Sequence, residues 1–238
     1  MSGSASENVS QDRMMLPRAD KIAKFRARLL RWYRMYGREL PWRDPGQSLY
    51  GQVISECLLQ RTRAEMVSDA FPRFVSKYPN WEARASAGEN ELGEILRPLG
   101  LWKRRAISLR ALAREMVARR GRFPSSREEI ENLPGVGQYI CNAILVFAHS
   151  EPAPLLDTNM ARVLERVFGK RKLADIRYDP YLQRLAATVV ESRKRAEINW
   201  AILDVASSIC KIRNPRCPEC PARRLCKWAR VHGGARVA

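Results

Sequence analysis

The sequence predicts an all-α protein, and three observations support this fold class. Apolar residues recur every three or four positions along most of the chain, which is the period of a helix with one buried face. The alternation of apolar and polar residues that is typical of β-strands is nearly absent. Pro and Gly interrupt the helical pattern at short intervals, so the chain is expected to fold into about ten short helices.

The helical period is clearest in four segments, which are expected to bury one face each. Their apolar positions are Ile22, Phe25, Leu29, Trp32 and Tyr33; Ala106, Leu109, Leu112, Ala113 and Met116; Ile140, Ala143, Ile144 and Phe147; and Ile198, Ile202, Val205 and Ile209. The breaks fall at 41–46, 100, 121–124, 134–137, 152–154, 169 and from 215 onward. The first 17 residues are Ser-rich and lack this period, and we expect them to form a disordered tail.

Composition indicates a globular protein that binds a polyanion. With 238 residues and a 45% hydrophobic fraction, the chain can bury a sizeable core. Its net charge is +18, from 43 Lys and Arg against 25 Asp and Glu, which favours nucleic acid as the partner. A solubilising surface charge or attraction to anionic lipid are the alternatives. Neither a membrane-spanning run nor a secretion signal is visible, so we expect a cytoplasmic, nucleoid-associated protein with no membrane partner.

Four of the six cysteines cluster near the C-terminus in the spacing C-x6-C-x2-C-x5-C. They are Cys210, Cys217, Cys220 and Cys226. Clustered thiolates in a reducing environment are typically metal ligands, and this set suits either tetrahedral zinc or a [4Fe–4S] cluster. The surrounding loop is basic and would form a phosphate-binding surface if a metal held it rigid. Cys57 and Cys141 stand alone among apolar residues and are expected in the core.

A second motif, Leu133-Pro134-Gly135-Val136-Gly137, lies between a short helix and the apolar helix 138–148. Its glycines can adopt a positive φ, which permits a tight hairpin with backbone N–H groups exposed at the start of a helix. Such a turn can bind a phosphate group. An ordinary turn between two helices is the alternative.

With three further motifs, the sequence resembles the helix-hairpin-helix DNA glycosylases, the family that includes endonuclease III and the MutY-type adenine glycosylases. The further motifs are Leu40-Pro41-Trp42-Arg43, the segment 55–62 (SECLLQRT), and Leu156-Asp157-Thr158-Asn159 followed by Arg162-Val163. They occur, with the hairpin and the cysteine loop, in the family's order between about Leu40 and Trp228. The resemblance implies that the four cysteines hold a [4Fe–4S] cluster rather than zinc.

The resemblance also implies a two-lobed fold, in which a six-helix barrel domain packs on a [4Fe–4S] cluster domain and DNA binds in the cleft between them. We expect the barrel at 47–149, with the helix-hairpin-helix at 125–148. The cluster domain is expected at 18–46 and 150–230, with the iron–sulfur loop at 210–226. Tails are expected at 1–17 and 231–238.

Three residues match catalytic positions of the family. Asp157 follows the hairpin helix and would stabilise the positive charge that develops on deoxyribose, although an Asp before a helix is also an ordinary N-cap. Tyr139 stands where bifunctional relatives carry a lysine, and a phenol cannot form the Schiff base that leads to strand cleavage. Glu56 would protonate the leaving base or position water, although a lone Glu on an amphipathic helix is more often solvated.

The remaining candidate residues would bind DNA. They are Gln60 and Arg61, which would fill the gap left by the flipped base, together with Asn159, Leu133, Gly135, Val136, Gly137 and Gln138. The expected partner is double-stranded DNA that contains a mismatch or lesion, bound by a monomer.

The motifs leave the target base open between two monofunctional activities. The segment 138–141 and the Arg61-Thr62 step look like those of the MIG-type thymine/uracil mismatch glycosylases, and the sequence ends about a dozen residues past Cys226, where MutY-type enzymes continue into a further domain. We therefore expect excision of thymine or uracil opposite guanine, which leaves an abasic site. An adenine glycosylase acting at A·8-oxoguanine or A·G is the first alternative, and a non-catalytic DNA-binding or redox-sensing iron–sulfur module is the second.

Overall fold

The structure is a computed structural model that describes residues 16–232. The described residues form twelve α-helices and four short 3-10 helices, with no β-strand among them. The predicted all-α class is therefore confirmed. The tails expected at 1–17 and 231–238 lie outside the described residues except at their inner edges. No helix in the described part of the chain is long and apolar enough to span a bilayer.

The α-helices follow one another with short connections. In chain order they are α1 (Ala19–Tyr36), α2 (Leu49–Leu59), α3 (Ala64–Lys77), α4 (Trp81–Ser86), α5 (Glu89–Leu96), α6 (Trp102–Ala118), α7 (Arg127–Glu131), α8 (Gln138–Phe147), α9 (Thr158–Phe168), α10 (Pro180–Val190), α11 (Arg195–Ser208) and α12 (Lys227–His232). The 3-10 helices are η1 (Pro41–Arg43), η2 (Arg97–Leu99), η3 (Cys217–Glu219) and η4 (Arg223–Leu225).

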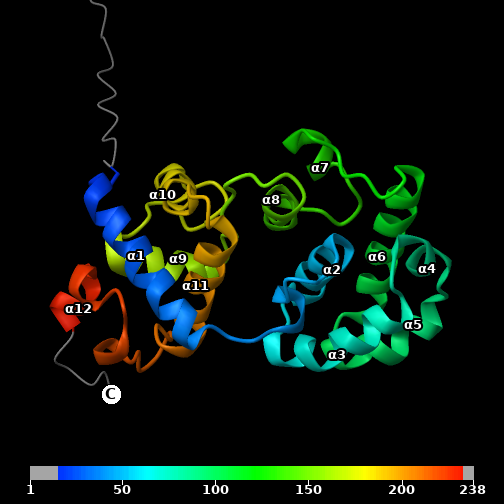
Figure 1. Cartoon of the computed structure of the whole chain (residues 1–238), viewed down its shortest axis with the longest axis horizontal. Helices are drawn as coiled ribbons and strands as arrows, with labels where there is room; N and C mark the ends of the chain where they lie inside the picture. Colours follow the sequence, from blue (N-terminus) through cyan, green and yellow to red (C-terminus); the bar gives the residue numbers. More distant parts are fainter. Residues whose placement is uncertain (1–15, 233–238) are drawn as a thin grey trace, which may run out of the picture.

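The helices form two lobes that lie side by side (Figure 1). One lobe contains α2 to α8, and its buried cluster includes Phe71 and Leu112. The other contains α1 and α9 to α12, and its cluster includes Phe25, Phe168 and Ile202. Because α1 packs on α11, the chain starts in the second lobe, crosses to the first and returns after α8.

Side-chain caps fix where several helices begin. The oxygens of Ser48, Asn80, Ser126, Asp157 and Asp179 each accept a hydrogen bond from a backbone N–H in the first turn of the following helix. These bonds satisfy donors that have no partner within the helix. The cap at Asp157 fixes the start of α9, the first helix after the chain returns from α8 to the second lobe.

A buried ion pair joins the segment between the lobes to α11. The two Nη atoms of Arg43, in η1, donate to the Asp204 carboxylate at 2.8 and 3.0 Å, and Arg38 donates to the same carboxylate from its backbone N (2.9 Å) and its Nε (2.7 Å). The Asp204 side chain is fully buried. The Arg43 guanidinium also lies 5.3 Å from the ring centroid of Trp200. This network fixes the path by which the chain leaves one lobe and enters the other.

Candidate active site

Glu56 and Tyr139 meet at the packed interface of α2 and α8. Glu56 is only 2% exposed, although an isolated Glu on an amphipathic helix is usually solvated. The Tyr139 hydroxyl, in the first turn of α8, donates a hydrogen bond of 3.0 Å to Oε2 of Glu56. The structure therefore brings together two of the three predicted catalytic residues, which are 83 positions apart in the chain.

Burial is the main influence on the acidity of this pair. It raises the pKa of Glu56 from 4.5 to about 7, with a further increase from the nearby charge of Asp157. The hydrogen bond from Tyr139 and the charge of Arg43 oppose this increase. Burial and the two neighbouring carboxylates also raise the pKa of Tyr139 well above 10, so Tyr139 stays a neutral phenol. Near neutral pH, Glu56 is thus poised to give or to take a proton.

Asp157 caps α9 and is itself held in place by the residues that follow it. Its Oδ1 accepts from the backbone N–H groups of Asn159 (2.9 Å) and Met160 (2.8 Å), and its Oδ2 accepts from Nδ2 of Asn159 (2.7 Å). Arg162 in turn donates to Oδ1 of Asn159 at 3.1 Å. The side chain is partly exposed, and its charge influences both Glu56 and Tyr139. The three predicted catalytic residues therefore form one electrostatic group.

The predicted hairpin connects α7 to α8 and is held in place by two buried apolar side chains. Leu133 and Val136 are buried, whereas Gly135 and Gly137 are exposed. Gly135 has a φ of 74°, which favours glycine, and a Cβ at this position would make a tight contact of 3.1 Å with Cβ of Ser108. Gly137 is the N-cap residue of α8 and has an extended backbone (φ −106°), so it does not use the positive φ that glycine permits.

Gln138, the first residue of α8, connects the hairpin to the other lobe. Its Nε2 donates to Oε1 of Gln183, in α10, at 3.3 Å. Gln183 is held in turn by a bond of 2.7 Å from its Nε2 to the carbonyl of Ile176. Gln138 is therefore partly occupied with positioning the hairpin against the second lobe.

The predicted gap-filling residues lie at the end of α2. Gln60 and Arg61 are both exposed, and Arg61 has a φ of 57°. Arg105 of α6 donates hydrogen bonds to this turn and was not among the residues predicted from the sequence. The sequence does contain a pattern that indicates its burial. Arg105 lies four, seven and eleven residues before Leu109, Leu112 and Met116, so it falls on the same buried face of the helix.

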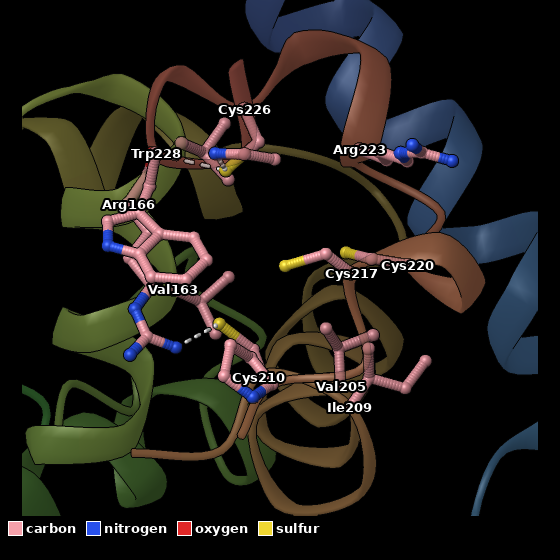
Figure 2. A pocket seen from close by; sticks show the side chains of 13 residues that line it. Val163, Arg166, Val205, Ile209, Cys210, Cys217, Cys220, Arg223, Cys226 and Trp228 are labelled. Atoms are coloured by element: carbon pink, nitrogen blue, oxygen red, sulfur yellow. Dashed lines mark hydrogen bonds between the residues drawn. The ribbon is translucent and has the colours of Figure 1, made fainter. Parts of the chain in front are cut away.

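The four clustered cysteines surround one cavity in the second lobe. Figure 2 shows Cys217 and Cys220 close together on one side, with Cys210 and Cys226 on the others. Val163, Val205 and Ile209 contribute apolar walls to this cavity. Nη1 of Arg166 lies 3.3 Å from Sγ of Cys210, and the backbone N–H of Ala229 lies 3.4 Å from Sγ of Cys226. No three His, Cys, Asp or Glu side chains within 16–232 converge on a point where they could hold a single metal ion.

Within residues 16–232 the helices form two lobes, and the glycine hairpin leads directly into α8, whose Tyr139 contacts the buried carboxyl of Glu56. A family model described as the HhH-GPD superfamily base excision DNA repair protein matches residues 54–190. The chain belongs to this family, and the predicted superfamily is confirmed.

Individual relatives extend the match over most of the chain. A thymine-DNA glycosylase of Aeropyrum pernix is 40% identical over 211 residues, which cover 87% of this chain and 94% of that protein. A thymine/uracil-DNA glycosylase of Pyrobaculum aerophilum is 36% identical, with 89% and 94% covered. Adenine DNA glycosylases also match, at 34% identity or less. The solved structure of a thermostable thymine-DNA glycosylase superposes with a TM-score of 0.81 at 31% identity, over 89% of this chain and 98% of that one.

Proposed function

We propose that this protein is a monofunctional DNA glycosylase that removes thymine or uracil mispaired with guanine and leaves an abasic site. The observation that carries the proposal is the buried carboxyl of Glu56, held by the Tyr139 hydroxyl and electrostatically coupled to Asp157. The names of the relatives with 36–40% identity support thymine and uracil as targets.

The three residues divide the reaction between them. The glycosidic bond cannot be reached inside a duplex, so the target nucleotide is rotated out of the helix before reaction. As the bond breaks, the carboxylate of Asp157 stabilises the positive charge on the sugar. Glu56, with its pKa of about 7, protonates the leaving base or orients the attacking water. Tyr139 holds Glu56 in place and provides no amine to attack the sugar, so the strand stays intact.

The hairpin and the α2 turn would hold the DNA on either side of this centre. The exposed backbone of Gly135 and Gly137 is suited to a phosphate group, while the buried Leu133 and Val136 support the turn from beneath. Gln138 and Asn159 would contact the DNA beside the hairpin. Gln60 and Arg61 are free to enter the duplex and replace the flipped base. We further propose that the protein acts as a monomer on mismatched double-stranded DNA in the nucleoid.

The two lobes would correspond to the two functional domains. We propose that 47–149 is the six-helix barrel domain, and that 18–46 with 150–230 is the cluster domain. The two separate buried clusters of hydrophobic residues support this division. The DNA cleft would then lie at their junction, beside Asp157 and the hairpin.

We propose that the cysteine cavity holds a [4Fe–4S] cluster. Cys210, Cys217, Cys220 and Cys226 provide four sulfur donors around a shared space with apolar walls, which is the donor set that such a cluster requires. When bound, the cluster would serve as a rigid structural cross-link. The loop 211–216 would then present Lys211 and Arg213 to DNA phosphates, while Arg216 donates to the Ser208 carbonyl and pairs with Glu219.

The proposal is tested with end-labelled duplexes that contain one T·G, U·G, A·G or A·8-oxoguanine pair. After incubation with the protein, alkali converts abasic sites into strand breaks. We expect strand breaks at the T·G and U·G pairs and not at the adenine pairs, and we expect them to appear only after the alkali treatment. Breaks confined to the adenine pairs would establish the adenine glycosylase instead, which the weaker adenine-glycosylase matches favour as the second candidate. Breaks before alkali would refute monofunctional action, and breaks at none of the pairs would favour a non-catalytic binding module.

A further inference from the structure

Arg105, in α6, donates four hydrogen bonds from its two terminal nitrogens to the end of α2 and the turn that follows it. Nη1 donates to the carbonyls of Cys57 (2.9 Å) and Leu58 (2.7 Å). Nη2 donates to the carbonyl of Gln60 (3.1 Å) and to Oγ1 of Thr62 (2.9 Å). The residue is 8% exposed. One planar guanidinium thus joins the last turn of α2 to the turn that follows it.

The charge of Arg105 is balanced by the helix end. The last carbonyls of a helix have no partner within it and carry a partial negative charge. Among the described residues, no carboxylate forms an ion pair with Arg105; its acceptors are three carbonyls and one hydroxyl. The buried guanidinium has these acceptors only while the turn keeps its observed conformation. A shift of the turn would leave the charge of Arg105 without hydrogen-bond partners, which is unfavourable at a buried position.

The turn that Arg105 holds has an unfavourable backbone conformation. Arg61 has a φ of 57°, in the left-handed region that non-glycine residues seldom adopt. Two further bonds close the turn: the backbone N–H of Thr62 donates to the Leu59 carbonyl at 3.1 Å, and Oγ1 of Thr62 donates to the Leu99 carbonyl at 3.2 Å. A strained turn that is fixed from the interior, with exposed side chains at its tip, is typical of a preorganised binding element.

We propose that Arg105 is a positioning residue for base flipping: its guanidinium holds the turn 60–62 in the conformation that directs Gln60 and Arg61 into the duplex. The proposal rests on the function proposed above, in which these two side chains fill the gap left by the target base. Preorganisation of the turn removes the cost of ordering it when DNA binds. Because Glu56 lies in the same turn of α2 as Cys57, the bond also fixes the spacing between the gap-filling side chains and the reacting carboxyl.

The test is a mutant cycle in single-turnover excision from a T·G duplex. We expect Arg105→Met to lower the rate by about ten- to a hundredfold, since small displacements of positioning groups have effects of this size. Arg105→Lys keeps the charge but lacks the planar fork, and should lose most of the same rate. In a Gln60→Ala/Arg61→Ala background, which is itself slow, Arg105→Met should cause little further loss, because the side chains that it positions are gone.

Arg84→Met is the matched control. Arg84 is a second buried arginine, at 0% exposed, and it donates to the carbonyl of Ala106, the residue after Arg105, at 2.7 Å. No hydrogen bond between Arg84 and the turn 60–62 is found among the described residues. It should lower thermal stability while leaving the single-turnover rate of the folded protein within about twofold. Equal rate losses for Arg84→Met and Arg105→Met would overturn the proposal, as would a full additive loss from Arg105→Met in the Gln60→Ala/Arg61→Ala background.

Hydrogen–deuterium exchange separates this proposal from the proposed activity. In the full-length protein without DNA, Arg105→Met should speed exchange of the Thr62 amide, and Arg84→Met should not. Unchanged exchange at Thr62 would overturn the role of Arg105 even if the enzyme removes thymine as proposed. Faster exchange in a protein that excises no base would leave Arg105 as the holder of the turn and refute the glycosylase function instead.

Discussion

The hydroxyl of Tyr139 donates a 3.0 Å hydrogen bond to Oε2 of Glu56, so the residue that replaces a lysine nucleophile also holds the proposed acid. This bond stabilises the charged carboxylate and lowers the pKa of Glu56 below the value that burial alone would produce.

Tyr139→Phe should therefore move the pH profile of excision. Loss of the hydrogen bond raises the pKa of Glu56 above about 7. If reaction requires protonated Glu56, activity is lost as pH rises through this pKa, so the alkaline limb should move to higher pH. The measurement is the single-turnover rate on U·G between about pH 5 and pH 9. A limb that stays in place, or moves to lower pH, would contradict the proposed acid.

Glu56→Gln should stabilise the protein at alkaline pH while it slows excision. A carboxyl whose pKa rises from 4.5 to about 7 on folding stabilises the folded state fully below pH 4.5, and this contribution is lost as pH rises through 7. The difference corresponds to about 3 kcal/mol. In urea unfolding at pH 8, the variant should be more stable than the wild type by up to this amount. Glu115→Gln, which removes a partly exposed carboxylate paired with Arg119 one helical turn away, is the control and should nearly reproduce the wild-type pH dependence.

Two substitutions at Asp157 separate its charge from its cap. Asparagine also caps helices, so Asp157→Asn should keep the fold and DNA affinity but abolish measurable excision, because it removes the charge that stabilises the sugar cation. Asp157→Ala should in addition lose the bonds to the N–H groups of Asn159 and Met160, which costs about 1 kcal/mol of unfolding free energy. Gel shift, single-turnover excision and urea unfolding report the three effects. A strong loss of DNA binding in Asp157→Asn would indicate that capping is its main role.

Asp204→Asn should destabilise the connection between the lobes. The change leaves the buried Arg43 without its carboxylate, whereas the partly exposed Arg38 keeps its ion pair with Glu65; breaking a buried pair in this way costs about 3 kcal/mol or more. Urea unfolding at neutral pH measures the loss. Asp175→Asn removes a carboxylate from an exposed pair with Arg177 and should leave stability nearly unchanged. Similar stability for both variants would mean that the Arg43–Asp204 pair does not hold the interface.

The purified protein should contain iron and inorganic sulfide in equal amounts, bound by the cysteine loop. Cys217→Ser should lose both elements and weaken DNA binding, because the basic loop is no longer held. Cys141→Ala changes a fully buried cysteine of the other lobe and should keep the metal content. Elemental analysis and gel shifts provide the readouts. One zinc per chain in place of iron would refute the cluster.

The sequence alone determined the local structure, because local signals depend on neighbouring residues. The apolar period specified the helices that contain Phe25, Leu112 and Ile202, all of which are buried. Gly135 indicated the hairpin, since few other residues accept a φ of 74° without strain. Asp157 stands directly before a helix, and the N-cap that this position suggested is present. The ordered motifs then placed these elements in a known family.

Only the tertiary structure decided the chemistry of the site. The pKa of Glu56 rises because the helices around it exclude water, and no pattern of adjacent residues reports desolvation by distant ones. The bond between Tyr139 and Glu56 spans 83 positions, and Arg105 reaches carbonyls that lie 45 to 48 positions earlier. An arginine on a helix is usually solvated, and the sequence does not distinguish it from a buried one. Arg105 binds the α2 turn because packing leaves its guanidinium little solvent and few other acceptors. Local propensity thus specified the helices, and long-range burial decided the hydrogen-bond partners and the acidity of their polar side chains.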